Sequence, residues 1–121
     1  KQFMKGMQQI AQEGAIQIFQ EYNMGMEEVI VGVVGVLQFD VLKYRLENEY
    51  NVEIRMDKLP YEHIRWIENE DVNMDKLVGT SDMKKIQDLK GRPLLLFVNS
   101  WSVGMVLDRN EGLILSEFGR E

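Results

Sequence analysis

Residues 28–41 are EVIVGVVGVLQFDV, and the hydrophobic pattern changes within this stretch. The near-continuous valine and isoleucine of residues 29–34 predicts a strand that is covered on both faces or central in a sheet. After Gly35, the apolar residues recur about once per helical turn, at Phe39, Leu42, Leu46 and Tyr50. This spacing predicts a helix over residues 36–50, and we expect Gly32 and Gly35 to form the tight turn between the two elements.

Shorter periodic segments flank this strand and helix. Upstream, apolar residues at helical spacing predict a helix that Gly14 ends, then a short strand over residues 15–19 and a turn over 21–26. Downstream, apolar and charged residues alternate, which predicts a half-buried strand over residues 52–56. Residues 1–57 therefore predict the order helix, strand, strand, helix, strand.

Pro60 introduces a second half, residues 58–121. Its expected elements are a strand over 61–68, a polar loop over 69–79, a short helix capped by Thr80 or Ser81 and closed by Gly91, a strand over 94–98, a helix over 100–110 and a strand over 113–118. The segment 100–110 also alternates like a strand, but Gly112 favours a helix because glycine commonly follows a helix end. Both halves together predict one α/β (α+β) domain over residues 1–121, and we expect the two halves to share, or closely abut, one core.

The composition excludes several classes of protein. The chain has 121 residues, which suffice for one hydrophobic core, and it has no apolar run near the roughly 20 residues that span a bilayer. It contains no cysteine, so disulfides and thiol chemistry are excluded and a cytoplasmic location is expected. The net charge of -6 argues against strong, non-specific binding to nucleic acid. Because the chain begins with Lys1 in a helical pattern, we expect it to be a piece of a longer protein.

Several residue patterns that could carry chemistry have simpler explanations. The glycines of the opening stretch lack the spacing of a phosphate-binding loop, and the run Asp88-Leu-Lys-Gly91 matches a short element of GTPases by chance. His63 is the single histidine, so we expect a structural or surface role for it. Ser100 is better interpreted as a helix cap than as a nucleophile, because no nucleophile elbow surrounds Ser100 or Ser102.

Acidic, basic and large apolar residues give three further expectations. The acidic residues Glu68, Glu70, Asp71 and Asp75 lack the order of a calcium loop, so a solvated loop is expected. The two tryptophans and eight methionines are expected to fill the core. One basic group stands out in an acidic chain as a candidate phosphate contact, with a solvated helix face as the simpler explanation: Lys84, Lys85, Lys90 and Arg92.

The sequence also carries a family resemblance. Residues 28–41 and the run YRLENEYNVE, residues 44–53, closely resemble the C-terminal domain of bacterial peptide chain release factor 3. Three further runs fit the same family over essentially the whole chain: KQFMKGM at 1–7, EGAIQIF at 13–19 and IRWIE at 64–68. The region also resembles the third domain of elongation factor G. The resemblance therefore implies a ferredoxin-like α-β sandwich that lacks its first strand, followed by a small β-α-β-α-β half.

The resemblance implies a function as well. The parent would be a translational GTPase that uses GTP to help remove class I release factors from the ribosome. Its GTP-binding domain and β-barrel, with GTP and magnesium, would lie outside this chain, so no cofactor, metal or GTP hydrolysis is expected here. The domain would pack on neighbouring domains of the parent chain and contact RNA and protein of the small ribosomal subunit, with neither membrane nor DNA as a partner. It would couple nucleotide state to domain orientation. Val33, Leu37 and Val41 are expected to pack internally.

Two other interpretations stay open. The chain could be the equivalent piece of another translational GTPase such as elongation factor G, although the residues after Pro60 argue against this. It could also be a small metal-dependent enzyme that uses its acidic residues. In the ferredoxin-like interpretation the missing first strand leaves a sheet edge open, which predicts some tendency to dimerise.

Overall fold

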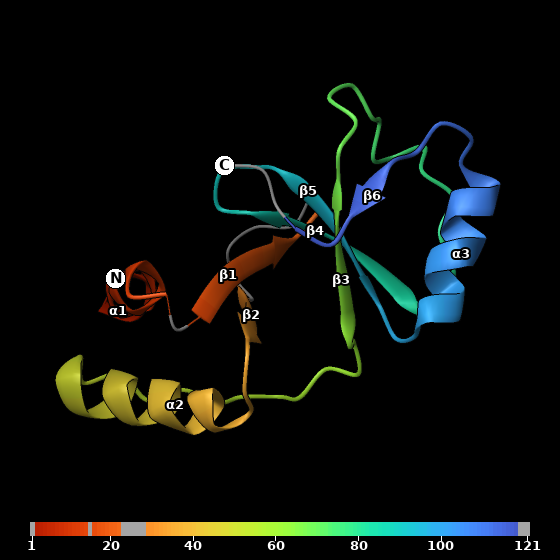
Figure 1. The fold of residues 1–121 in the computed structure, drawn as a ribbon. Coiled ribbons are helices and arrows are strands. Elements are labelled where there is room, and N and C mark those ends of the chain that lie inside the picture. The colour runs from red at the N-terminus through yellow and green to blue at the C-terminus, as the bar shows by residue number, and fades with distance from the viewer. Residues whose placement is uncertain (1, 15, 23–28, 119–121) are drawn as a thin grey trace. The chain divides into compact units, whose positions relative to one another are not determined.

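The computed structural model describes residues 2–14, 16–22 and 29–118 and shows an α+β fold (Figure 1). The elements are α1 (Gln2–Gln12), β1 (Ile16–Glu21), β2 (Val29–Val33), α2 (Leu37–Glu49), β3 (His63–Ile67), β4 (Met83–Asp88), β5 (Pro93–Phe97), α3 (Ser100–Arg109) and β6 (Leu115–Ser116). The expected class is thereby confirmed. The described residues within 1–19 and 28–58 form one compact unit, and those within 20–27 and 59–121 form a second.

The first unit packs both of its helices against β1 and β2. Its buried core comprises Met7 and Ile10 of α1, Ile16 and Ile18 of β1, and Leu42 and Leu46 of α2. The spacing of these residues places them on one face of each element, because helical side chains repeat every three to four residues and strand side chains every two. The order α1-β1-β2-α2 is the central part of a ferredoxin-like β-α-β-β-α-β motif.

The two helices of this unit approach each other closely at Gly6. A Cβ atom at Gly6 would lie 2.8 Å from Cδ2 of Leu46 and 2.9 Å from the ring of Tyr50, so only glycine fits without a shift. Arg45 of α2 reinforces the contact, with its guanidinium 2.7 Å from the carboxylate of Glu13. This hydrogen bond lowers the pKa of Glu13.

Three expectations for this unit are wrong. Residues 52–56 form no strand, because Val52 donates its backbone N–H back to Leu46 at 3.0 Å instead of joining a sheet. Leu37 and Val41 are 75% and 53% exposed, whereas Val33 packs against the core as expected. Gly32 lies inside β2 rather than in the following turn.

Gly32 has its own packing reason. A Cβ atom there would lie 3.3 Å from the ring of Phe19 on the neighbouring strand, so the glycine leaves room for that ring. The strand expected over 15–19 corresponds to β1, although residue 15 lies outside the described residues. Residues 23–26 of the turn expected over 21–26 also lie outside the described residues.

The second unit is built on β4, β5, β3 and β6, which are neighbours in that order and pair antiparallel. β5 is central, and its residues Leu94, Leu95 and Phe97 are fully buried. One face of this sheet carries a buried core that includes Leu95 and Phe97 of β5 and Val106 of α3 (Ser100–Arg109). The end of β1 is also part of this unit, and Tyr22 donates its backbone N–H to the carbonyl of Lys85 at 3.0 Å.

The expected helix before Gly91 is wrong, because residues 83–88 are strand β4. Met83 pairs with Phe97 and Ile86 with Leu94 in antiparallel register. The second unit therefore has the order β-β-β-α-β in place of β-α-β-α-β. The structure confirms the polar loop over 69–79, the strand over 94–98 and the helix over 100–110. The last strand, expected over 113–118, contains only Leu115 and Ser116.

The large apolar residues follow the core expectation only in part. Met7 and Met74 are buried in the first and second cores. Trp66 is half-buried, but Trp101 is 71% exposed on the outer surface of α3. Among the described residues, no helix is both long enough and apolar enough to cross a membrane.

Candidate functional site

The four basic residues singled out in the sequence lie on and beside the hairpin of β4 and β5. Asp88 organises its turn, because the carboxylate accepts hydrogen bonds from the backbone N–H groups of Lys90 at 3.0 Å and Arg92 at 2.8 Å. Gly91 has a φ of +83°, which favours glycine. An aspartate at the start and a left-handed glycine near the end are typical of short hairpin turns. The run that matches a GTPase element is this turn.

Lys84 and Lys85 lie on opposite faces of β4, because side chains alternate along a strand. The ammonium group of Lys84 lies 2.9 Å from the carboxylate of Glu21, at the end of β1. Lys85 donates to two backbone carbonyls of the polar loop, that of Met74 at 2.7 Å and that of Leu77 at 3.0 Å. Lys85 thus fastens this loop to the sheet.

Arg92 is held by two groups beside the turn. Its Nε donates to Oδ2 of Asp88 at 2.7 Å, and its guanidinium carbon lies 4.9 Å from the centre of the Trp66 ring, in a cation–π contact. Lys90 is exposed. The structure therefore places Lys90 and Arg92 in one turn and separates Lys84 from Lys85, so the four do not share one face. A contact of these residues with the ribosome stays a prediction.

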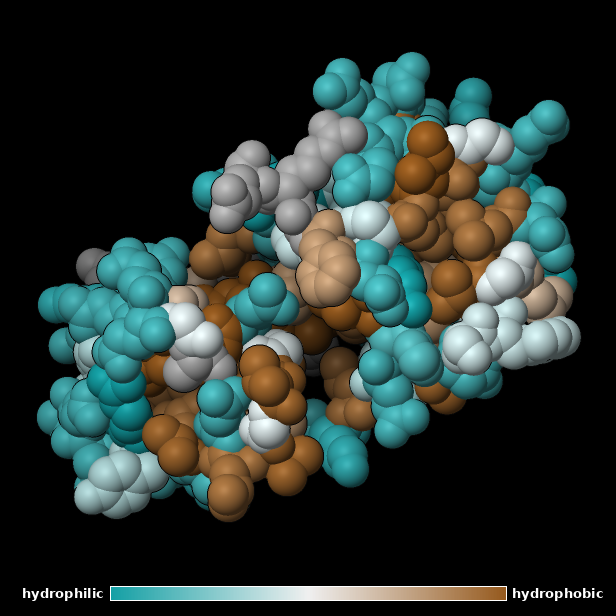
Figure 2. Space-filling view, in the orientation of Figure 1, coloured by the Kyte–Doolittle hydropathy of each residue, from teal (hydrophilic) through white to brown (hydrophobic). Residues whose placement is uncertain are grey.

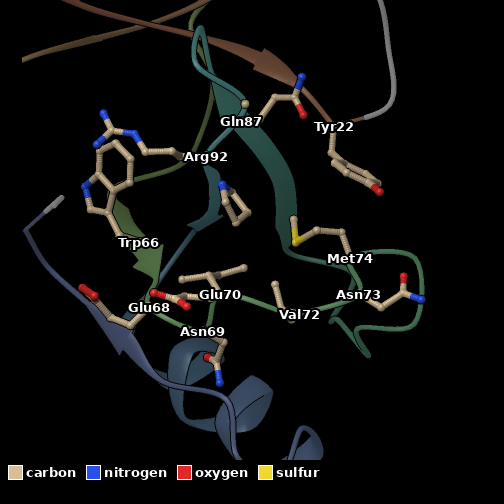
Figure 3. Close-up of a pocket in the computed structure, with 13 residues that line it drawn as sticks. Tyr22, Trp66, Glu68, Asn69, Glu70, Val72, Asn73, Met74, Gln87 and Arg92 are labelled. Atoms are coloured by element: carbon tan, nitrogen blue, oxygen red, sulfur yellow. The ribbon is translucent and has the colours of Figure 1, made fainter. Parts of the chain in front are cut away.

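A cavity of about 620 Å³ lies beside the hairpin, within the second unit (Figure 3). Trp66 and Tyr22 stand on opposite sides of it, and Glu68 and Glu70 line its base. Glu68 accepts a hydrogen bond from the hydroxyl of Ser116 at 2.7 Å.

Only part of this cavity could be predicted from the sequence. Trp66 was expected in the core, and the acidic residues 68 and 70 in a solvated loop. Tyr22 could not be assigned to it, because it reaches the cavity through pairing with Lys85, 63 positions away. The one available signal is the alternation of Trp66 and Glu68, which places these two side chains on the same face of an extended segment.

The metal-site alternative finds no support in the part of the chain that the structure describes. In residues 2–14, 16–22 and 29–118 there is no group of three or more histidine, aspartate and glutamate side chains that could hold a metal ion. Asp71 and Asp75 are exposed in the polar loop, and His63 is half-buried at the start of β3. The solvated interpretation of the acidic loop fits these positions.

The serines at the start of α3 form a structural network. Asn99, rather than Ser100, caps the helix by accepting the backbone N–H of Ser102 at 3.0 Å. The hydroxyl of Ser102 is completely buried and donates to the carboxylate of Asp82 at 2.6 Å. This hydrogen bond, with a further one from Thr80, lowers the pKa of Asp82. A carboxylate without an imidazole cannot activate the hydroxyl as a nucleophile in the way a catalytic triad does.

These features define an α+β domain whose candidate site is a basic turn beside an aromatic and acidic cavity. The family model described as "Class II release factor RF3, C-terminal domain" matches residues 1–107. The chain belongs to this family, as its resemblance predicted.

Curated relatives agree with the family assignment. Peptide chain release factor 3 of Symbiobacterium thermophilum is 43% identical over 114 residues, which cover 94% of this chain and 21% of the relative. The corresponding proteins of Nostoc punctiforme and Streptococcus mutans are 39% identical over 96% and 97% of this chain. The chain thus spans about a fifth of the length of these relatives, 21% and 22% of the latter two.

Proposed function

We propose that this chain is a non-catalytic domain that contacts the ribosome and couples conformations within a peptide chain release factor 3. In this proposal the full polypeptide uses GTP to promote release of class I release factors in translation termination. The observation that carries the proposal is the family match over residues 1–107 together with about 40% identity to release factor 3 over nearly the whole chain.

The sequence supports the non-catalytic part of this proposal. The chain contains no phosphate-binding loop of the form G-x-x-x-x-G-K followed by serine or threonine. It covers only 21–22% of its relatives, so the GTP chemistry is assigned to polypeptide outside the matched region. The purified chain is expected to show no GTP hydrolysis above a blank containing GTP and magnesium. Hydrolysis that co-purifies with the chain through two chromatographic steps would overturn this part.

The exposed turn between β4 and β5 supports the ribosome contact. Six more acidic than basic residues give the chain a negative net charge, so a contact with phosphate must be local. Lys90 is exposed at the tip of the turn, and Arg92 is oriented beside it by Asp88. Lys85 already binds two carbonyl groups of the same chain, which makes it a poor phosphate ligand.

Co-sedimentation with small ribosomal subunits at increasing salt tests the contact. The wild-type chain is compared with Lys90→Glu and with the matched control Lys58→Glu, another exposed lysine outside the hairpin. We expect the wild type and the control to pellet together at low salt and Lys90→Glu to pellet several-fold less, because a phosphate contact is lost and a repulsive charge is added. Equal pelleting of all three proteins would overturn the assignment to the turn, and no pelleting of the wild type would overturn the direct contact.

A further inference from the structure

The cavity beside the hairpin of β4 and β5 combines features that the proposed function does not use. Its volume of about 620 Å³ lies within the range of about 300–1,000 Å³ that is usual for ligand pockets. Hydrophilic side chains are common over the surface seen in Figure 2, so carboxylates alone do not set the cavity apart. Its distinguishing feature is that two aromatic rings, those of Trp66 and Tyr22, line the same space as charged and amide groups (Figure 3).

The Trp66 side of the cavity is a preformed stacking surface. The guanidinium of Arg92 lies over the Trp66 ring, 4.9 Å from its centre, and Asp88 holds this guanidinium by accepting a hydrogen bond from Nε at 2.7 Å. Trp66 itself is half-buried and pairs with Leu94 on one side and with Ser116 on the other. Unstacked RNA bases stack on aromatic rings and on planar arginine side chains, and both kinds of surface occur together here.

The polar groups of the cavity include both hydrogen-bond donors and acceptors. Glu68 and Glu70 at its base only accept when they are ionised, whereas the guanidinium of Arg92 only donates. The amide of Gln87 can do both, and it forms no hydrogen bond with the part of the chain that the structure describes. A neutral, planar ligand with donors and acceptors along its edge matches this mixture, and a nucleobase is such a ligand.

The charges argue against a lysine or arginine side chain of a protein partner as the ligand. Such a cation would suit the two carboxylates, but it would also lie near the guanidinium of Arg92, which already covers part of Trp66. Like charges repel at short range, and an uncharged base meets no such repulsion. Lys90, exposed in the turn that borders the cavity, is a cation for the phosphate attached to the base.

We propose that this cavity binds one unpaired base of single-stranded RNA and prefers bases with an exocyclic amino group over uracil. The carboxylates of Glu68 and Glu70 explain the preference, because the amino group of cytosine, adenine or guanine donates to a carboxylate. Uracil has carbonyl oxygens at the corresponding positions, and these repel it. The inference rests on the proposed function in one respect, the choice of RNA rather than a free nucleotide as the source of the base.

Quenching of Trp66 fluorescence tests the proposal in the Trp101→Phe variant, in which Trp66 is the single tryptophan. Trp101 is 71% exposed, so the fold is expected to tolerate this replacement. The ligands are oligocytidylate and oligouridylate of equal length, and cytidine and uridine monophosphate represent free nucleotides. Oligocytidylate is expected to quench Trp66 and to bind roughly tenfold more tightly than oligouridylate, because only cytosine donates to the carboxylates.

Two double variants locate the preference. In the first, Glu68→Gln is combined with Glu70→Gln, which preserves side-chain size and the acceptor for Ser116. An amide both donates and accepts, so we expect the two oligomers to bind this variant equally. The matched control combines Asp71→Asn with Asp75→Asn, which removes the same charge from the same loop outside this cavity, and it should keep the preference. Circular dichroism verifies that each variant is folded.

Equal binding of the two oligomers to the Trp101→Phe protein, or no quenching by either, would overturn the proposal. Loss of the preference in the control variant as well would overturn the role of the two carboxylates. Quenching by an oligolysine peptide but not by oligocytidylate would overturn the proposal in favour of a basic protein segment, and equally tight binding of cytidine monophosphate would do so in favour of a free nucleotide.

The fluorescence measurement contains no ribosome, so it separates this inference from the proposed function. Cytidylate-selective quenching by a chain that does not pellet with small subunits would support the base site and overturn the direct ribosome contact. Pelleting without any quenching would overturn the base site alone.

Discussion

The two adjacent lysines of β4 are predicted to differ sharply in their contribution to stability. Lys85→Met keeps the aliphatic stem but removes the ammonium group that binds the carbonyls of Met74 and Leu77. Both of these loop residues are buried, at 5% and 7% exposure, so water replaces the lost donors poorly. Hydrogen bonds to charged groups contribute about 1.5–3 kcal/mol, and we expect Lys85→Met to lower the free energy of unfolding by about 2 kcal/mol.

Lys84→Met is the matched comparison on the same strand. Its ion pair with Glu21 joins side chains that are 29% and 41% exposed, and such surface pairs contribute about 0–1 kcal/mol. Lys90→Met, in the exposed turn, should change stability by no more than about 0.5 kcal/mol.

Urea unfolding followed by tryptophan fluorescence measures these differences. Both tryptophans of the chain, Trp66 and Trp101, lie in the second unit, where the lysines are. A loss of 2 kcal/mol corresponds to a melting temperature lower by about 10 °C for a unit of this size. A Lys85→Met protein within 0.5 kcal/mol of the wild type, or one no less stable than Lys84→Met, would refute the role assigned to Lys85.

Three further predictions concern packing and pH. Gly6→Ala should lower the melting temperature, because its Cβ would lie 2.8 Å from Leu46 and overpacking costs about 1–3 kcal/mol. This cost exceeds the gain of about 1 kcal/mol in helix propensity from glycine to alanine. An unchanged melting temperature would contradict the close helix contact. Leu95→Ala should cost about 2–5 kcal/mol in urea unfolding, because Leu95 is fully buried in the central strand; a loss below 1 kcal/mol would contradict its place in the core. The hydrogen bond from Ser102 lowers the pKa of Asp82 in the folded state. The ionised carboxylate therefore stabilises the fold above the unfolded pKa of about 4, and this stabilisation is lost as the pH falls through the lower folded value. Asp82→Asn should flatten the acid side of a stability–pH curve, and an unchanged slope would exclude this linkage.

Several elements could be predicted because local pattern and tertiary packing agree in them. Strand β2 and helix α2 follow from a change of hydrophobic period around Gly35, and Leu42 and Leu46 occupy the core positions that the helical spacing gives. Helix α3 follows from its spacing and from Gly112, which has a φ of +85° and is therefore in the conformation expected after a helix. In each case one continuous segment contains the whole signal.

The prediction of a helix in place of strand β4 was wrong because the local signals fit two structures equally well. Met83, Ile86 and Leu89 have the spacing of one helix face, and Gly91 suits a helix end as well as a hairpin turn, since both need a left-handed residue. Pairing with β5 decides between them, and no pattern within the β4 segment itself reveals this pairing. The strand predicted over 52–56 does not form, because an alternating pattern alone does not supply a neighbouring strand with which to pair.

The candidate site shows the same division. The basic residues could be found from the sequence, but whether they share a face depends on the element that carries them: a helix would group them, whereas a strand places Lys84 and Lys85 on opposite sides. Which apolar residues of α2 are exposed could not be predicted from the sequence for a related reason. Val41 and Leu42 are equally apolar, and the orientation of the helix on the sheet decides that one is exposed and the other buried.

The sequence by itself determined the family, the α+β class and the segments with a strong local period, because each of these depends on residue identity within short stretches. Only the tertiary structure decided which strands pair, which lysine fastens the polar loop and which face of α2 is exposed. These features depend on contacts between different elements of the fold, and the free energy of such contacts outweighs local preferences that amount to a fraction of a kcal/mol per residue.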